Sequence, residues 1–289
     1  MKGTGRVFRA ELYRLTRSRT AWFGLIAVTA IAAIRVFAAH VADNAAHAEA
    51  LSQALMAGRA LPDAPPAGNA YAPLVEGWLA GLTVGTLLLL VHSARTIAGD
   101  RETGILRIAR TRSISRNGLV VGRFLLGTAL VVLLILASGL GSWITTSLFF
   151  EFGPLVEDGY ELISEQELLS ELQKAVVAAI PPLIATYAFG LMISAFGRTA
   201  TGSVGFCLAV FFGFDLFKDV IGSAQVWVFA FFTPSLVDKS CLHEMAGIAS
   251  GFSDAGYTEF VLRMNHVVPW PEALLFLCIA CWIVSRRPL

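Results

Sequence analysis

The feature that most constrains the fold is a series of six long apolar runs separated by polar segments. The hydrocarbon core of a bilayer is about 30 Å thick, and about 20 helical residues span it. The runs approach or exceed this length, and only 15% of the 289 residues are charged, which is low for a soluble domain. We therefore predict an all-α integral membrane protein with six transmembrane helices. The runs lie near residues 21–40, 74–98, 119–148, 175–196, 203–222 and 270–285.

The fifth run is the least regular of the six. Asp215, Lys218 and Asp219 interrupt it, and a second apolar run from Val226 to Phe232 follows directly. Irregular backbone is tolerated at membrane depth only where protein or a water-filled cavity surrounds it. We interpret residues 223–269 as an external loop that contains a re-entrant segment before the sixth helix.

Basic and acidic residues are segregated along the chain, although the net charge is only +1. Cytoplasmic loops of membrane proteins carry an excess of Lys and Arg, so the basic segments are assigned to the cytoplasm. Acidic residues gather in the loops before the fourth and sixth runs. We predict a multi-pass protein of the inner (plasma) membrane with both termini cytoplasmic. The basic residues are Lys2, Arg6, Arg9, Arg14, Arg17, Arg19, those between Arg95 and Arg123, Arg198, Arg286 and Arg287.

Residues 5–19 carry apolar side chains at helical spacing, with arginines around the remaining surface. This pattern predicts an amphipathic interfacial helix on the inner leaflet. The alternative is a flank that only satisfies the positive-inside rule. We find no separate soluble domain, so residues 1–289 are treated as one transmembrane domain.

Two local patterns predict details of the helices. Ser164 and Glu167 have the spacing of a capping box, which indicates a helix start before the fourth run. Gly81 and Gly141 each have a small residue four positions away. Such pairs share one helix face and let neighbouring backbones approach closely.

A short basic strip, residues 99–117, lies between the second and third runs. It contains Asp100, Arg101, Glu102 and Gly104, then Ile105-Leu106 and Ser113-Ile114-Ser115-Arg116, with Gly122-Arg123 after it. The pattern resembles the cytoplasmic loop of type-2 ABC exporter permeases, which shows an acid-rich Glu-x-Gly-Thr-Leu stretch, a later Ser-Arg and then Gly-Lys. Ile105 replaces the usual Thr and Arg123 the usual Lys. The six-helix architecture extends the resemblance over nearly the full chain.

The resemblance implies that residues 99–117 contain a coupling helix that inserts into a groove of a separate ABC ATPase subunit. It also implies that residues 5–19 form the interfacial connecting helix, and that a second copy or a similar permease completes a dimer. Ile105, Leu106 and Ile108 can pack into the ATPase. Arg101, Glu102 and Arg107 can pair at its rim and set the orientation. The alternative is a solvated basic loop that touches only anionic lipid. The residues assigned to ATPase coupling are Asp100, Arg101, Glu102, Gly104, Ile105, Leu106 and Arg107.

No phosphate-binding loop of the Gly-x-x-x-x-Gly-Lys-Ser/Thr type occurs in the sequence. We therefore expect no catalytic residue and no bound cofactor in this chain, with ATP and Mg²⁺ held by the partner ATPase. An intramembrane enzyme would need a convergent polar cluster, and the runs contain no Ser-His-Asp set or His-Glu-x-x-His motif. Membrane lipids are expected partners, and nucleic acid is not.

Three further sets of residues are candidates for a site. Arg35 and Asp215 lie at a similar depth of their runs, which suggests an intramembrane ion pair, although Arg35 could instead snorkel. No metal is expected, but Cys241, His243 and Met245 alternate in the external loop and are weak candidates for a soft metal. In the resembled family, helices two and five line the substrate path. The path candidates are Thr83, Thr86, Phe211, Phe212 and Phe214.

These observations favour the permease subunit of an ATP-driven exporter that moves an amphipathic or hydrophobic substrate by alternating access. The alternative is an ATPase-coupled factor for envelope assembly or metalloenzyme maturation, which transmits mechanical change without exporting a solute. The same coupling helix would serve either function.

Overall fold

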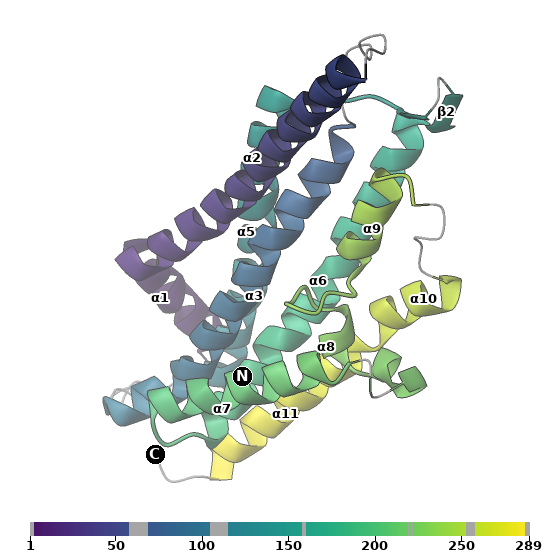
Figure 1. Cartoon of the computed structure of the whole chain (residues 1–289). Coiled ribbons are helices and arrows are strands. Elements are labelled where there is room, and N and C mark those ends of the chain that lie inside the picture. The colour runs from purple at the N-terminus through teal and green to yellow at the C-terminus, as the bar shows by residue number, and fades with distance from the viewer. Residues whose placement is uncertain are drawn as a thin grey trace.

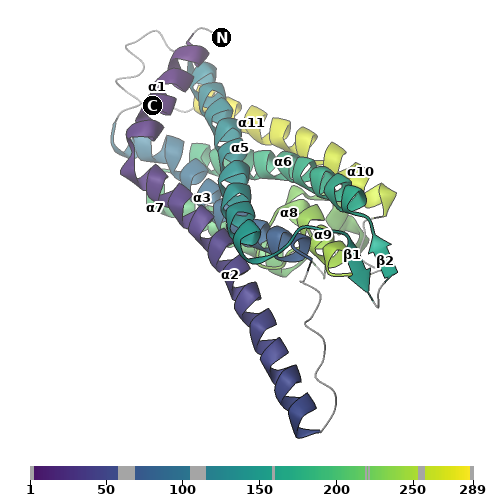
Figure 2. The same cartoon turned by 90° about the horizontal axis from the view of Figure 1, so that it is seen from above.

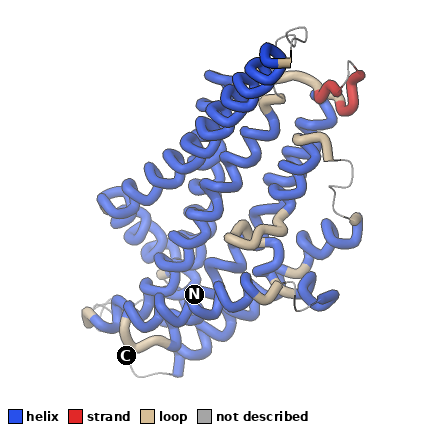
Figure 3. The backbone as a smooth tube through the Cα atoms, in the orientation of Figure 1, coloured by secondary structure: helices blue, strands red, loops and turns tan. Residues whose placement is uncertain are grey.

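The computed structural model describes residues 3–57, 69–104, 115–157, 160–218, 220, 222–252 and 258–286. These residues are almost entirely helical, and the only strands among them form one small hairpin (Figures 1 and 3). The predicted all-α class is therefore confirmed. The helices are α1 (Thr4–Arg17), α2 (Arg19–Met56), α3 (Tyr71–Glu102), α5 (Arg116–Phe149), α6 (Glu165–Phe196), α7 (Ala200–Leu216), the 3-10 helix η1 (Gly222–Trp227), α8 (Phe229–Phe232), α9 (Cys241–Ala249), α10 (Glu259–Val267) and α11 (Pro269–Arg286).

Five helical segments of the described chain are long and apolar enough to cross a membrane. They are α2, α3, α5, α6 and the continuous segment Glu259–Arg286, which joins α10 to α11. The predicted fifth span corresponds to α7, which has 17 residues and is therefore about 25 Å long. It ends at Leu216, earlier than the apolar run, while Asp219 lies outside the described residues.

Helix α2 is much longer than the apolar run that predicted it. It continues without a break beyond the apolar run and ends only at Met56. The segment after Val41 is rich in Ala, the residue with the highest helix propensity, and has no Gly or Pro before Gly58. Figure 2 shows the C-terminal half of α2 extending away from the remaining helices.

Small residues let α2, α3 and α5 pack closely, as the sequence predicts. Gly81 of α3 lies directly against Ser138 of α5 and Ala32 of α2. A Cβ on Gly141 would lie 2.6 Å from the Thr29 carbonyl oxygen, a distance that no side chain tolerates. Any larger residue at these two glycines would force the helices apart.

The end of the bundle that holds the start of α6 carries the hairpin. Strands β1 (Leu155–Glu157) and β2 (Tyr160–Ile163) pair antiparallel and lead into the capping box of α6. That box is confirmed, because the Ser164 side chain accepts from the Glu167 backbone N–H while the Glu167 carboxylate accepts from the Ser164 N–H. The sequence patterns did not indicate the hairpin.

The second apolar run after α7 folds as η1 and α8. All four residues of α8 are buried, and the Phe229 backbone N–H donates to Glu272 Oε2 of α11 at 2.7 Å. Protein therefore surrounds α8, which is the condition that a re-entrant segment has to meet. Whether the segment enters a membrane stays a prediction.

Candidate functional site

The predicted ATPase-coupling residues begin in the last turn of α3. The helix ends at Glu102, and Gly104 adopts a left-handed conformation with a φ of 74°. The backbone N–H groups of Thr103 and Gly104 donate to the carbonyls of Gly99 and Arg101, as in a glycine-terminated helix. We call Asp100–Gly104 the root of the coupling segment. Ile105, Leu106 and Arg107, the other three predicted coupling residues, lie outside the described residues.

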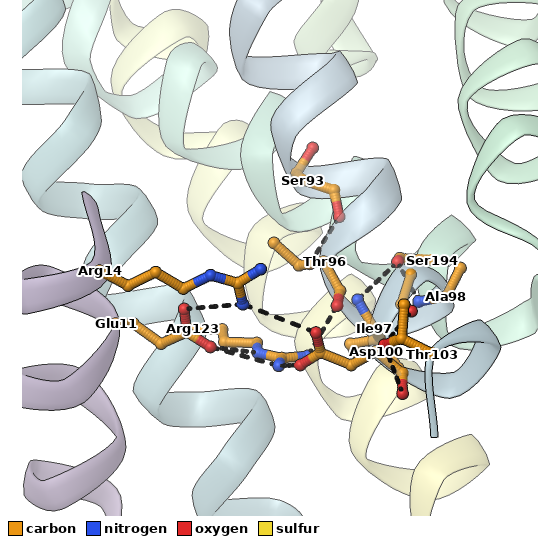
Figure 4. Close-up of polar contacts among 11 residues, drawn as sticks. Glu11, Arg14, Ser93, Thr96, Ile97, Ala98, Asp100, Thr103, Arg123 and Ser194 are labelled. Carbon is orange, nitrogen blue, oxygen red and sulfur yellow. Dashed lines mark hydrogen bonds and ion pairs between the residues drawn. The ribbon is translucent and has the colours of Figure 1, made fainter. Parts of the chain in front are cut away.

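Asp100 forms a buried ion pair with Arg123 of α5 (Figure 4). The side chains are only 9% and 3% exposed. Arg123 also contacts Glu11 of α1 at 3.2 Å and donates to the Thr96 carbonyl at 3.0 Å. Arg14 of α1 lies 3.7 Å from the Asp100 carboxylate. Two acids and a carbonyl thus surround one buried guanidinium. Their contacts compensate the desolvation of this guanidinium and join α1, α3 and α5.

A second set of contacts joins the root to the end of α6. The Arg101 guanidinium donates to the carbonyls of Ala195 and Gly197, where the partial negative charge of a helix C-terminus is located. Slightly deeper, Ser194 Oγ accepts from the backbone N–H groups of Ile97 at 2.9 Å and Ala98 at 3.0 Å. The last turns of α3 and α6 are therefore held side by side.

Glu102 joins the root to α7. Its Oε2 accepts from the Ala200 backbone N–H, at the first residue of α7, at 2.8 Å. A carboxylate at this position is favourable because the N-terminus of a helix carries a partial positive charge. We expected Arg101 and Glu102 to pair at the rim of a partner protein. Instead, both bond to helix ends of their own chain.

The other flank of residues 105–114 is anchored in the same way. Ser115 caps α5 by accepting from the Gly118 N–H at 3.1 Å. Arg116 donates to the Ser285 carbonyl in the last turn of α11 at 2.5 Å. Because α1 contacts Asp100 and Arg123, the helices nearest both termini lie at the end of the bundle that holds the root (Figure 2).

The predicted pair between Arg35 and Asp215 is wrong. Arg35 of α2 pairs with Glu76 of the neighbouring helix α3, with 2.7 Å between Nη2 and Oε2. Asp215 pairs with Lys218 at 2.8 Å, one turn further along, and both side chains are at most 3% exposed. Arg35 has its partner on an adjacent helix, and Asp215 has its partner in the turn just after α7, which similarity of depth could not reveal.

The candidate residues for a substrate path differ in how far they are buried. Helices α3 and α7 pack against each other, and the two most central candidates, Thr86 and Phe211, are buried. The hydroxyls of Thr83 and Thr86 donate to carbonyls one turn earlier in α3. Phe212 is half-buried and Phe214 is 37% exposed. Their role in transport stays a prediction.

The weak candidates for a soft metal do not converge. All three lie on α9, where successive residues are rotated by about 100°; Cys241 and Met245 are buried, whereas His243 is exposed. Burial raises the pKa of the Cys241 thiol to about 12, which disfavours the thiolate that binds metals. The described residues contain no group of three His, Cys, Asp or Glu that could hold a metal ion.

The clearest omission of the sequence reasoning is the partnership of Glu11 and Arg123. The sequence position of each residue is unusual for its charge. Glu11 is the one acidic residue among the first 19, and Arg123 is the one charged residue between Arg116 and Glu151. A charge that is unlike its surroundings indicates a specific partner, since its burial would otherwise be costly.

Comparison with known proteins adds a family assignment. The model of a family described as ABC-2 family transporter protein matches residues 6–246. The matched region covers α1 to the greater part of α9, and so includes the root, Glu11 and Arg123. No curated protein matches the chain.

Proposed function

The chain belongs to the ABC-2 transporter family, and on this premise we propose that it is the membrane permease subunit of an ATP-driven exporter. A separate cytoplasmic ABC ATPase would bind ATP and Mg²⁺ and hydrolyse the ATP. The substrate class that fits best is hydrophobic or amphipathic, because the described helices present apolar and aromatic side chains with few charges.

The observation that carries the proposal is the set of bonds around the root. Through Asp100, Arg101 and Glu102, the end of α3 is bonded directly to α5, α6 and α7. Asp100 and Arg123 also contact Arg14 and Glu11, and these contacts connect α1 to the same set of helices. The residues on both sides of 105–114 are bonded to other helices. A displacement applied to residues 105–114 would therefore be passed on to those helices.

This arrangement separates two roles within the coupling segment. Residues 105–114, which include Ile105, Leu106 and Arg107, would contact the ATPase. Asp100, Arg101 and Glu102 are bonded inside the chain, so they would transmit the movement instead of making the contact. Gly104 lets the backbone leave α3 in its left-handed conformation.

The remaining features of the proposal follow the family arrangement. Helix α7 would be the fifth of six crossings, with both termini on the cytoplasmic side of the inner membrane. Helix α1 would lie on the lipid surface, and η1 with α8 would form the re-entrant segment. A second copy, or a similar permease, would complete a dimer in which α3 and α7 line the path for alternating access.

One observation favours the alternative function of a mechanical assembly factor. Helix α2 has 38 residues and is about 57 Å long, nearly twice the thickness of a bilayer core. Its exposed C-terminal half could act on an envelope protein. ATP-dependent flux of a solute in proteoliposomes would favour export, whereas an ATP-dependent action on a bound protein without flux would favour the alternative.

Co-purification tests the coupling proposal. The tagged chain should retain an ABC ATPase, and cysteines placed in residues 105–114 should cross-link to it. The matched control is a cysteine at Leu55, near the end of α2 and 63% exposed, which should not cross-link. Equal cross-linking at both sites, or retention of no ATPase, would contradict the proposal.

A further inference from the structure

A half-exposed ion pair lies on the outer surface of α2 and α3. Arg35 Nη2 and Glu76 Oε2 are 2.7 Å apart, and the two side chains are 48% and 35% exposed. The flanking side chains on α2 are apolar, with Ile34 64% and Phe37 49% exposed. This surface therefore combines one cation and one anion with an otherwise hydrophobic environment.

The pair lies at hydrocarbon depth in a membrane-spanning arrangement. Arg35 comes 16 residues after Arg19, which corresponds to about 24 Å along the helix axis. The hydrocarbon core is about 30 Å thick. The next polar residue of α2, His40, lies five residues further on. The guanidinium is thus a few ångströms inside the boundary opposite to the root.

The internal partner leaves most of the polar capacity of this pair unused. A guanidinium has five N–H donors and a carboxylate about four acceptor positions. Within the described part of the chain, the contact with Glu76 is the one polar contact of Arg35, and the reverse holds for Glu76. Charges exposed at this depth are costly unless polar groups reach them. Lipid headgroups can do so by local thinning of the bilayer.

We propose that Arg35 and Glu76 form a binding site for the headgroup of a zwitterionic phospholipid in the outer leaflet. The phosphate would bind Arg35, since a guanidinium fork matches phosphate oxygens, and the ammonium would bind Glu76. An anionic headgroup offers no cation to Glu76 and should bind less well. Naming the outer leaflet rests on the proposed transporter orientation, but the site itself does not need an ATPase.

The test is lipid-dependent thermal unfolding of the purified chain in detergent. Short-chain phosphatidylethanolamine is compared with phosphatidylglycerol of the same acyl chains. The wild type should bind phosphatidylethanolamine more tightly. Arg35→Gln should weaken that binding by about tenfold, as expected when a charge-assisted hydrogen bond of about 1.4 kcal/mol is lost. Glu76→Gln should remove the preference between the two lipids.

Two further variants keep the result interpretable. Arg35→Gln combined with Glu76→Gln avoids an unpaired charge, so it should fold and show neither binding nor preference. Arg263→Gln removes one member of a largely exposed pair with Glu259 and should leave lipid binding unchanged. Equal binding by the wild type and the double variant would overturn the proposal. Loss of a dimer in Arg35→Gln, measured without added lipid, would also overturn the proposal. It would show that the pair contacts a second copy of the chain and not a lipid headgroup.

Discussion

The carboxylate of Asp100 on α3 and the guanidinium of Arg123 on α5 form an ion pair inside the helix bundle, at the point where the predicted ATPase-coupling segment begins. Glu11 of α1 contacts the same guanidinium. The pair therefore connects the segment to the interior of the bundle. Its burial means that each member depends on the other for its solvation, which makes it sensitive to single substitutions.

Asp100→Asn should destabilise the protein by about 3 kcal/mol, the lower end of the range for removing one member of a buried pair, because Glu11 still faces Arg123. The double variant Asp100→Asn with Arg123→Met should lose less free energy of unfolding than the sum of the losses in the two single variants. Chemical unfolding in detergent measures both. Arg263→Gln, from a largely exposed pair, should cost less than about 1 kcal/mol. Additive losses in the double variant would contradict the pairing.

Gly104→Ala should destabilise the end of α3 by about 1–2 kcal/mol, since its φ of 74° is unfavourable for a residue with a Cβ. Gly205→Ala is the matched control. Gly205 lies within α7 and has open space where the alanine methyl group would lie, and Ala is favoured over Gly in a helix by about 0.5–1 kcal/mol. The temperature of thermal unfolding should therefore fall in Gly104→Ala and rise in Gly205→Ala. A shift of the same sign in both would show that the left-handed conformation is not required.

Glu102→Ala should remove the bond that joins the root to the first residue of α7. The stability loss should be about 1 kcal/mol, typical of a lost helix cap. Glu167→Ala, in the capping box at the far end of α6, should cost a similar amount. ATP-driven activity of the complex should fall in Glu102→Ala alone. Equal activity in the two variants would show that Glu102 stabilises the fold but does not transmit the movement of the coupling segment.

Lys218→Met should destabilise the protein by about 3–5 kcal/mol because it leaves the buried carboxylate of Asp215 without its cation. Lys218 Nζ also donates to Ser235 Oγ at 2.8 Å, so the loop after α8 should loosen. Hydrogen exchange at residues 233–240 would report this. Adding Asp215→Asn should recover part of the stability. No recovery would mean that Lys218 acts through packing alone.

The positions of five of the six predicted spans match helical segments long enough to cross a membrane, because bilayer thickness fixes the number of apolar residues that one crossing needs. The capping box at Ser164 and the close packing at Gly81 and Gly141 were also predictable, since each depends on local spacing. The unbroken continuation of α2 past its apolar run was not predicted, because hydropathy marks only the part of a helix that could lie in a membrane. Alanine propensity, which favours a helix there, was the better guide.

The partners of charged residues were less predictable. Arg35 bonds to Glu76 instead of Asp215, because contact depends on which helices are neighbours and not on depth alone. Likewise, the spacing of Arg101 and Glu102 indicates a charged helix end but not the positions of the α6 and α7 termini that bind them. The role of the strip from residue 99 in ATPase coupling stays a prediction, and its link to Glu11 required the three-dimensional arrangement.

The most direct test of the central claim is a distance measurement by pulsed electron paramagnetic resonance on the permease in complex with its ATPase. Spin labels at Tyr13 on α1 and Phe206 on α7, both more than half exposed, would be introduced after replacing the four native cysteines. ATP should shift the distance between the labels in the wild type. In Asp100→Asn combined with Arg123→Met, the ATPase should still bind and hydrolyse ATP while the shift is lost. A full shift in this variant would contradict transmission through the root.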